Sequence, residues 1–230
     1  MRDLHTHILP GMDDGSKTIE ESLELLHTLA QQGVDTVALT PHFYRARESA
    51  AEFLARREEA WKQLQDATRG QDYPKMILGA EVAWAPGMSE WPDLKKLCYE
   101  GTNLIQVELP GIPWVDDVFR QLYSMEGRYG VTPVIAHVDR YFRIQPKRNI
   151  EKLIDMGYTM QVSANALLHH FSRKRALELL IDFDAILISD CHNMEERRPA
   201  IDLAMNVIGK RYGSRAVNMV VANTDEAFLD

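Results

Sequence analysis

The stretch "MRDLHTH" (residues 1–7) is a short apolar segment that ends in two histidines. Six further apolar runs of similar length follow along the chain. They are "DTVALTPH" (35–42), "MILGAEV" (76–82), "LIQVELP" (104–110), "TPVIAHV" (132–138), "YTMQVSA" (158–164) and "AILISDC" (185–191). Their near-continuous apolarity, without alternation, predicts strands buried on both faces, as in a parallel sheet covered by helices.

Longer amphipathic segments separate these runs and predict helices. One is expected from about 19 to 32, because Thr18 and Glu21 fit a capping box before it and Gly33 can end it. Further helices are expected near 48–69, 115–130, 147–157, 173–182 and 195–212. The alternation of strands and helices predicts an α/β fold. A chain of 230 residues with 45% hydrophobic content suits one domain over 1–230.

Composition excludes several classes of protein. No apolar run approaches the roughly 20 residues that a membrane helix requires, so we expect no membrane span. The net charge of −8 argues against a nucleic-acid partner, which would need clustered basic residues. Cys98 and Cys191 are too few for a disulfide framework and suit a reducing compartment, so we expect a cytoplasmic protein.

Metal-capable side chains stand at the ends of almost all the predicted strands. They are His5, His7, His42, Glu81, Glu108, His137, Asp190 and His192. In a parallel barrel the carboxyl ends of the strands gather at one rim, where active sites lie. Residues two apart on a strand point the same way, so His5 with His7, and Asp190 with His192, are expected to converge. Mixed imidazole and carboxylate ligands suit Zn, Mn or Fe better than Ca or Mg.

Each of these residues also has an interpretation without a metal ion, and this interpretation differs between histidines and acids. A single histidine at a strand end is most often a solvated or hydrogen-bonded group. A carboxylate such as Glu81 or Glu108 near the end of a buried strand is costly without a cation or partner. The other three histidines, at 27, 169 and 170, lie on or beside predicted helices and are expected at the surface. The common placement of the set predicts a metal centre.

Six motifs in order, "DLHTH", "DDGSKTIEESL", "TPH", "GAEV", "AHVDRY" and "SDCHN", resemble the PHP (polymerase and histidinol phosphatase) superfamily. Within it they are most similar to the metal-dependent bacterial tyrosine-protein phosphatases of capsule and exopolysaccharide synthesis. The resemblance implies a distorted (β/α)7 TIM-like barrel with three divalent ions, often Mn, with Fe, Zn or Co as alternatives. It also implies a phosphotyrosine protein as substrate, namely a bacterial tyrosine kinase of polysaccharide synthesis.

The same resemblance assigns ligands position by position. It implies a first ion at His5, His7, Glu81 and Asp190, a second at Glu81, Glu108 and His137, and a third at Asp14, His42 and His192. Asp13 and Asp3 are then expected either to support the ligands or to have a structural role, and Asp3 is a candidate to orient a ligating imidazole through its other ring nitrogen. Replacement of Asp13 by Asn should cost much less activity than Asp14→Asn.

Two arginines match the phosphate-binding arginines of this family, Arg140 in "HVDRY" and Arg197 in "CHNMEERRP". Arg198 stands where the family usually has proline, which leaves the choice between Arg197 and Arg198 open. We expect two ions sharing Glu81 to bring a bridging water to a near-neutral pKa, giving a hydroxide that attacks phosphorus in line. A tyrosine leaving group, with a pKa of about 10, needs no dedicated general acid.

Other interpretations compete with this one. Cys191 and Arg197 have the C-x5-R spacing of cysteine-dependent phosphatases, but the loop between them holds Glu195 and Glu196 and lacks glycine, so we interpret the spacing as coincidence. A PHP phosphoesterase for a small molecule such as histidinol phosphate, and a non-catalytic binding module, are further alternatives. The loop at 82–94 is a candidate wall or lid. Aromatic residues expected to line the site or to pack in the core are Phe43, Tyr44, Trp84, Trp91 and Trp114.

Overall fold

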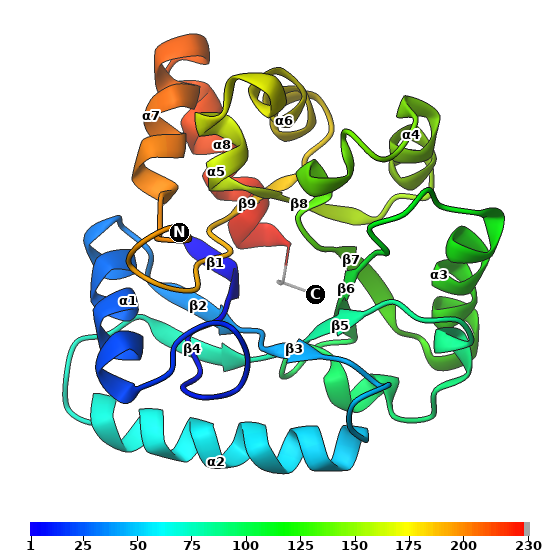
Figure 1. Cartoon of the computed structure of the whole chain (residues 1–230). Coiled ribbons are helices and arrows are strands. Elements are labelled where there is room, and N and C mark those ends of the chain that lie inside the picture. The colour runs from blue at the N-terminus through cyan, green and yellow to red at the C-terminus, as the bar shows by residue number, and fades with distance from the viewer. Residues whose placement is uncertain (228–230) are drawn as a thin grey trace.

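Parallel strands form the wall of a barrel in the computed structural model, which describes residues 1–227 (Figure 1). Among these residues one sheet has the order β1-β2-β4 and the other the order β3-β5-β6-β7-β8-β9, with every neighbouring pair parallel. The strands are β1 (Arg2–Thr6), β2 (Thr36–Leu39), β3 (His42–Phe43), β4 (Lys75–Leu78), β5 (Glu81–Ala83), β6 (Leu104–Glu108), β7 (Thr132–Ile135), β8 (Thr159–Ser163) and β9 (Ile186–Ile188).

Two of the seven expected strands are each split into two pieces. The run 35–42 carries β2 and the start of β3, and the run 76–82 carries β4 and the start of β5. The pieces stay aligned, because Gly79 donates its backbone N–H to Leu39 O at 2.9 Å and Glu81 donates to Pro41 O at 3.0 Å. At Gly79 an added Cβ would lie 2.9 Å from the Tyr99 ring, so the chain passes too close to that ring for a larger residue.

The two ends of the strand series meet and close the barrel. The Asp190 N–H donates to His5 O at 3.1 Å, and the His7 N–H donates to Cys191 O at 3.0 Å. These bonds place the segment after β9 beside the end of β1. The distorted seven-stranded barrel expected from the sequence is therefore the fold observed.

Helices surround the strands (Figure 1). They are α1 (Ile19–Gln31), α2 (Ala50–Thr68), α3 (Asp116–Tyr129), α4 (Lys147–Asp155), α5 (Ala164–Leu168), α6 (His170–Asp182), α7 (Ile201–Tyr212) and α8 (Ser214–Glu226), with short 3-10 segments η1 (Met88–Glu90), η2 (Leu94–Leu97) and η3 (Val138–Tyr141). The Thr18 hydroxyl caps α1 by accepting the Glu21 N–H at 3.3 Å, but the Glu21 carboxylate accepts from the Lys17 N–H, so the expected capping box is only half formed.

Three features of the helices differ from expectation. The helix expected at 195–212 begins only at Ile201, because the Asn193 side chain accepts the Glu195 and Arg197 N–H groups in a turn and Pro199 disfavours helix in the residue before it. Helices α5 and α8 were not expected.

Within the described part of the chain, no helix is both long and apolar enough to cross a membrane.

Candidate metal centre

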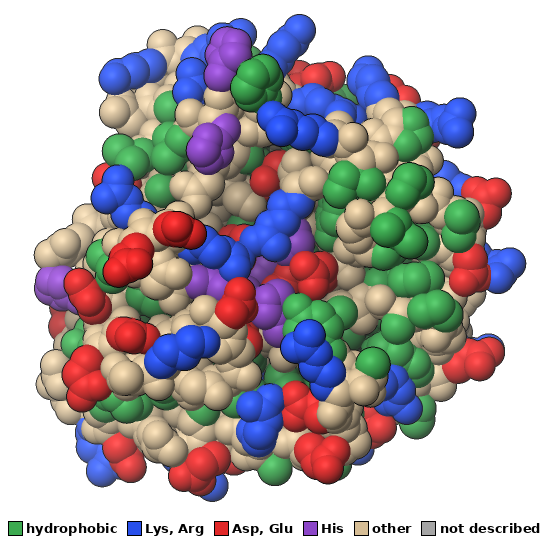
Figure 2. All heavy atoms as spheres, in the orientation of Figure 1, with side chains coloured by type: hydrophobic (Ala, Val, Ile, Leu, Met, Phe, Trp, Pro, Cys, Tyr) green, Lys and Arg blue, Asp and Glu red, His purple; other side chains and the backbone are tan. Residues whose placement is uncertain are grey.

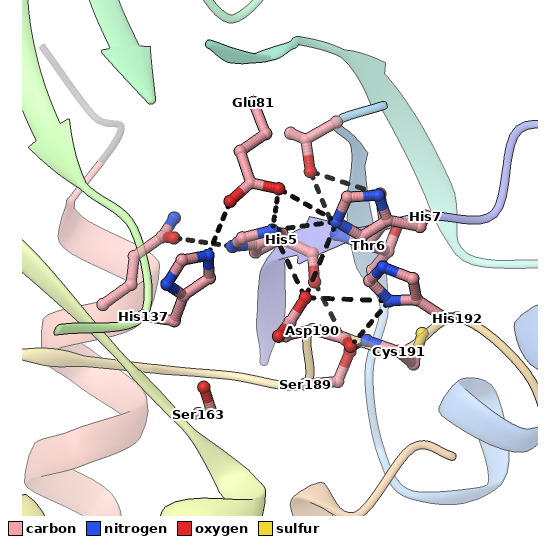
Figure 3. Close-up of polar contacts among 12 residues, drawn as sticks. His5, Thr6, His7, Glu81, His137, Ser163, Ser189, Asp190, Cys191 and His192 are labelled. Carbon is pink, nitrogen blue, oxygen red and sulfur yellow. Dashed lines mark hydrogen bonds and ion pairs between the residues drawn. The ribbon is translucent and has the colours of Figure 1, made fainter. Parts of the chain in front are cut away.

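The nine predicted ligands come together at the carboxyl ends of the strands. Figure 3 labels those among them that surround Glu81, namely His5, His7, His137, Asp190 and His192. The histidines and acids lie on or just after β1, β3, β5, β6, β7 and β9, and Asp14 reaches the cluster from the loop after β1. The groups whose ligand atoms all lie within 4.8 Å of one another are His7, Asp14, His42 and His192; His5, His7 and Glu81; and His42, Glu81 and Glu108.

Glu81 lies at the centre of the cluster and is fully buried. Its Oε2 lies 3.2 Å from the Nε2 atoms of both His5 and His7 and 3.0 Å from His42 Nδ1, while Oε1 lies 2.6 Å from His137 Nε2. Burial raises the pKa of Glu81, but the facing histidines outweigh burial and hold the pKa well below its usual range. The group is therefore an ionised carboxylate with an imidazole on each side, suited to bridging two cations.

Asp190 joins this cluster through an unusual backbone conformation. Its φ of 54° lies in the left-handed region, which non-glycine residues adopt at a cost. The sequence suggested that strand alternation points Asp190 and His192 the same way. Strand alternation does not set the direction of Asp190, because β9 already ends at Ile188. The turn nevertheless points Asp190 Oδ1 toward the cluster, 3.5 Å from His5 Nε2 and 3.7 Å from His192 Nδ1.

A second part of the cluster includes the exposed Asp14. Its Oδ1 lies 3.4 Å from both His42 Nε2 and His192 Nε2. His192 Nε2 is buried without a hydrogen-bond partner in the structure. Burial and the neighbouring His7 lower the pKa of His192 to about 2, so its imidazole is neutral at physiological pH. An unpartnered, neutral imidazole nitrogen facing a carboxylate fits a cation between the two side chains.

The far nitrogens of two imidazoles are held by partners from outside the predicted ligand set. His7 Nδ1 lies 2.7 Å from Asp13 Oδ2, and His5 Nδ1 lies 2.9 Å from Gln161 Oε1. Each partner oxygen accepts a hydrogen bond from Nδ1–H and leaves Nε2 directed at Glu81, the arrangement that orients histidines for metal binding. The sequence analysis did not identify Gln161, whose only signal was a polar side chain inside a buried strand run.

Of the two roles expected for Asp3, the structure shows the structural one. Its Oδ1 accepts the backbone N–H groups of Ser189 at 3.0 Å and His5 at 3.5 Å. Asp3 thus ties the end of β9 to β1. The residue beside the His5 ring nitrogen Nδ1 is Gln161.

Arg140 and Arg197 lie beside the cluster, and both donate to Asp190. Arg197 Nη2 is 3.0 Å from each Asp190 carboxylate oxygen, and its Nη1 is 3.2 Å from Asp14 Oδ2. Arg140 donates through Nη2 to Asp190 Oδ2. Arg198 is exposed, so of the two candidates left open it is Arg197 that reaches the cluster. Figure 2 shows histidine, acidic and basic side chains together in the central hollow of this face.

The cysteine-phosphatase arrangement is absent from the described residues. Cys191 is fully buried, and burial, aided by the Asp3 charge, raises the pKa of its thiol far above the usual range. The Arg197 guanidinium points to Asp190 and Asp14. The C-x5-R spacing is thus a coincidence of sequence, as expected, and Cys191 fills a buried position between two residues of the cluster.

The predicted aromatic residues divide into those that pack in or against the core and one that lies beside the cluster. Trp84 is partly buried and packs against the core. Phe43, Trp91 and Trp114 are buried and pack on other aromatic rings, with Phe43 5.1 Å from Phe53 between ring centroids. Tyr44 instead lies beside the cluster, 5.3 Å from the His42 ring. The segment 82–94 packs into the core through the buried Met88 and Trp91.

One protein family and several known proteins match this chain over nearly its whole length. The family described as "Capsular polysaccharide synthesis, CpsB/CapC" matches residues 1–230. The tyrosine-protein phosphatase CpsB of Streptococcus pneumoniae is 30% identical over 251 residues, covering 100% of this chain and 99% of that protein. The tyrosine-protein phosphatase YwqE of Bacillus subtilis is 30% identical, covering 98% and 90%.

Solved structures agree on the fold. One described as YwqE from Bacillus subtilis and CpsB from Streptococcus pneumoniae, "unique metal-dependent tyrosine phosphatases", matches with a TM-score of 0.80 at 24% identity, covering 98% of this chain and 93% of that one. The phosphotriesterase homology protein from Escherichia coli matches with a TM-score of 0.55 at 12% identity, covering 95% and 94%. The chain therefore belongs to the CpsB/CapC family of capsular polysaccharide synthesis.

Proposed function

We propose that this protein is a metal-dependent protein-tyrosine phosphatase that hydrolyses phosphotyrosine on a tyrosine kinase of polysaccharide synthesis. The observation that carries the proposal is the convergence of five histidines and four acids on one rim of the barrel, around the buried Glu81. The relatives named tyrosine-protein phosphatases support the substrate class.

The donor chemistry of the cluster supports a transition-metal centre. Neutral imidazoles together with carboxylates suit Mn, Fe, Zn or Co, and buried carboxylates are costly without a cation. We propose three ions, with Mn as the metal, held by His5, His7, Glu81 and Asp190, by Glu81, Glu108 and His137, and by Asp14, His42 and His192. When bound, such ions neutralise phosphate charge and acidify a water molecule for attack on phosphorus.

The arginines supply the rest of the phosphate site in this proposal. Arg140 and Arg197 offer planar forks of N–H donors that match phosphate oxygens, and both already point into the cluster at Asp190. Their positive charges are worth most as charge redistributes in the transition state. The phenolate of tyrosine, with a pKa of about 10, leaves without a dedicated proton donor.

The two free cysteines, both buried, support a cytoplasmic location for the protein, because a reducing compartment keeps thiols unpaired.

A substrate panel tests the proposed activity. The purified protein is assayed for phosphate release with Mn on a phosphotyrosine peptide, a phosphoserine peptide of the same sequence and histidinol phosphate. We expect turnover to be fastest on the phosphotyrosine peptide. Preference for histidinol phosphate would instead identify a small-molecule phosphoesterase with the same metal chemistry. Absence of turnover on all three would contradict an enzymatic role and favour a binding module.

A further inference from the structure

A hollow of about 400 Å³ opens beside the metal centre. Its lining residues are Met12, Asp13, Asp14, His42, Tyr44, Arg47, Glu48 and Arg56. Asp14 and His42 also belong to the candidate ligand group around His192, so the hollow adjoins the cluster directly. A group joined to a phosphate at the cluster by a single oxygen could enter it.

The position of Tyr44 is fixed from two directions. Its ring centroid lies 5.3 Å from that of His42, with the planes tilted by 33°, and the Arg47 guanidinium carbon lies 4.3 Å from it. Phe43, Trp91 and Trp114 are buried in the core, whereas Tyr44 lines the hollow. Tyr44 is thus a preformed aromatic surface beside the phosphate site.

The charges around the hollow favour a substrate that extends beyond the phosphate. Arg56 is paired with Glu48 at 2.7 Å and donates to Met12 O at 3.4 Å, which braces the wall. Arg47 forms no ion pair with any of the residues from 1 to 227. Its guanidinium lies over the Tyr44 ring. Arg47 is therefore a cation without an acidic partner among the residues that line the hollow.

We propose that this hollow binds the aromatic ring of the substrate, with Tyr44 as the wall against which the ring packs. The proposal rests on the proposed function and names how the site would select aryl over alkyl phosphates. In an aryl phosphate the ring carbon is bonded to the ester oxygen, so the ring must lie immediately next to the phosphate site. An alkyl phosphate such as phosphoserine has no ring to pack against Tyr44.

Binding of two non-hydrolysable probes separates this proposal from catalysis. Phenylphosphonate and methylphosphonate are titrated by calorimetry into the Mn-loaded protein, and the ratio of their affinities is compared between variants. Offset-stacked or edge-to-face aromatic pairs are worth enough for about a two- to tenfold preference. We expect wild type to prefer phenylphosphonate, Tyr44→Phe to keep this preference, and Tyr44→Ala to lose it. Tyr44→Leu, which keeps bulk without a ring, should lose most of it.

Controls make each outcome informative. Tyr123→Ala removes an exposed tyrosine on α3, with 69% of its surface accessible, and should leave both affinities unchanged. Circular dichroism and thermal melting check that each variant is folded. An equal preference in wild type and Tyr44→Ala would overturn the proposal, as would loss of the preference in Tyr44→Phe, which would assign it to the hydroxyl.

Kinetics distinguish failure of this inference from failure of the proposed function. With phosphotyrosine and phosphoserine peptides of one sequence, Tyr44→Ala should raise KM for the phosphotyrosine peptide by about two- to tenfold and so reduce the selectivity between the two. Selective wild-type turnover with unchanged selectivity in Tyr44→Ala would sink the role of Tyr44 alone. A wild type that prefers the phosphoserine peptide would overturn the proposed function itself.

Discussion

Replacing Asp13 by Asn should weaken metal binding, although Asp13 is not itself a predicted ligand. Asp13 Oδ2 accepts from His7 Nδ1 at 2.7 Å and from the His42 N–H at 2.9 Å, and Oδ1 accepts from the Gly15 N–H at 2.9 Å. The two oxygens thus serve three donors. Asn keeps one oxygen and replaces the other by an NH2 group, so at least one of these donors then faces another donor.

The magnitude follows from these contacts. Partners that orient a metal-binding histidine typically contribute 10- to 100-fold in metal affinity, which corresponds to about 1.4–2.8 kcal/mol. A buried donor left without an acceptor costs about 1–3 kcal/mol more in stability. Of the roles expected for Asp13, these contacts favour the supporting one, in which it holds His7 and His42 in position.

Calorimetric titration with Mn measures the loss directly. Asp72→Asn is the matched control, because Asp72 is exposed on the segment after α2 and its replacement changes the net charge equally. Asp13→Asn should bind Mn about 10- to 100-fold more weakly than Asp72→Asn, and should unfold at a lower urea concentration. Equal Mn affinities in the two folded variants would refute the reasoning.

Three further predictions concern protons, the buried thiol and a helix cap. Burial lowers the pKa of His7, but the Asp13 and Glu81 carboxylates outweigh burial and raise the pKa to about 10. Mn binding at pH 8 should therefore release protons, and this release should vanish above about pH 10. Calorimetric titrations in two buffers with different ionisation enthalpies measure the proton release, and equal binding heats in the two buffers at pH 8 would contradict the prediction. Cys191→Ser should retain phosphatase activity. The native Cys191 thiol should resist alkylation at pH 8, because burial raises its pKa. Rapid labelling of Cys191 in the folded protein would contradict this expectation. Ser49→Ala should cost about 1 kcal/mol in urea unfolding, because Ser49 and Glu52 form a reciprocal capping box on α2; an unchanged midpoint would show that the cap contributes nothing.

Sequence patterns located the strands well because a buried parallel strand needs a continuous apolar run. They missed the breaks within two of the strands, which occur at Pro41 and Gly79, and they missed α5 and α8. The turn before α7 depends on the Asn193 side chain and Pro199, a local signal that the helical pattern from 195 concealed.

The candidate site also has parts that the sequence predicts and parts that only the folded chain shows. Ligand types at strand ends are visible in sequence, because the carboxyl ends of parallel strands share one rim. The contact between Gln161 and His5 joins residues 156 positions apart, so only the folded chain brings it out. Asp190 likewise has a left-handed backbone and donates its N–H to His5 O, a contact between the two ends of the chain that the sequence pattern does not show.

The central claim is that the histidine and carboxylate cluster around Glu81 catalyses phosphotyrosine hydrolysis through bound metal. The most direct measurement is phosphate release from a phosphotyrosine peptide by protein stripped with EDTA, with its metal content checked, before and after addition of Mn. We expect stripping to abolish turnover and Mn to restore it. Stripped protein that retains the original rate would show that the cluster does not act through bound metal.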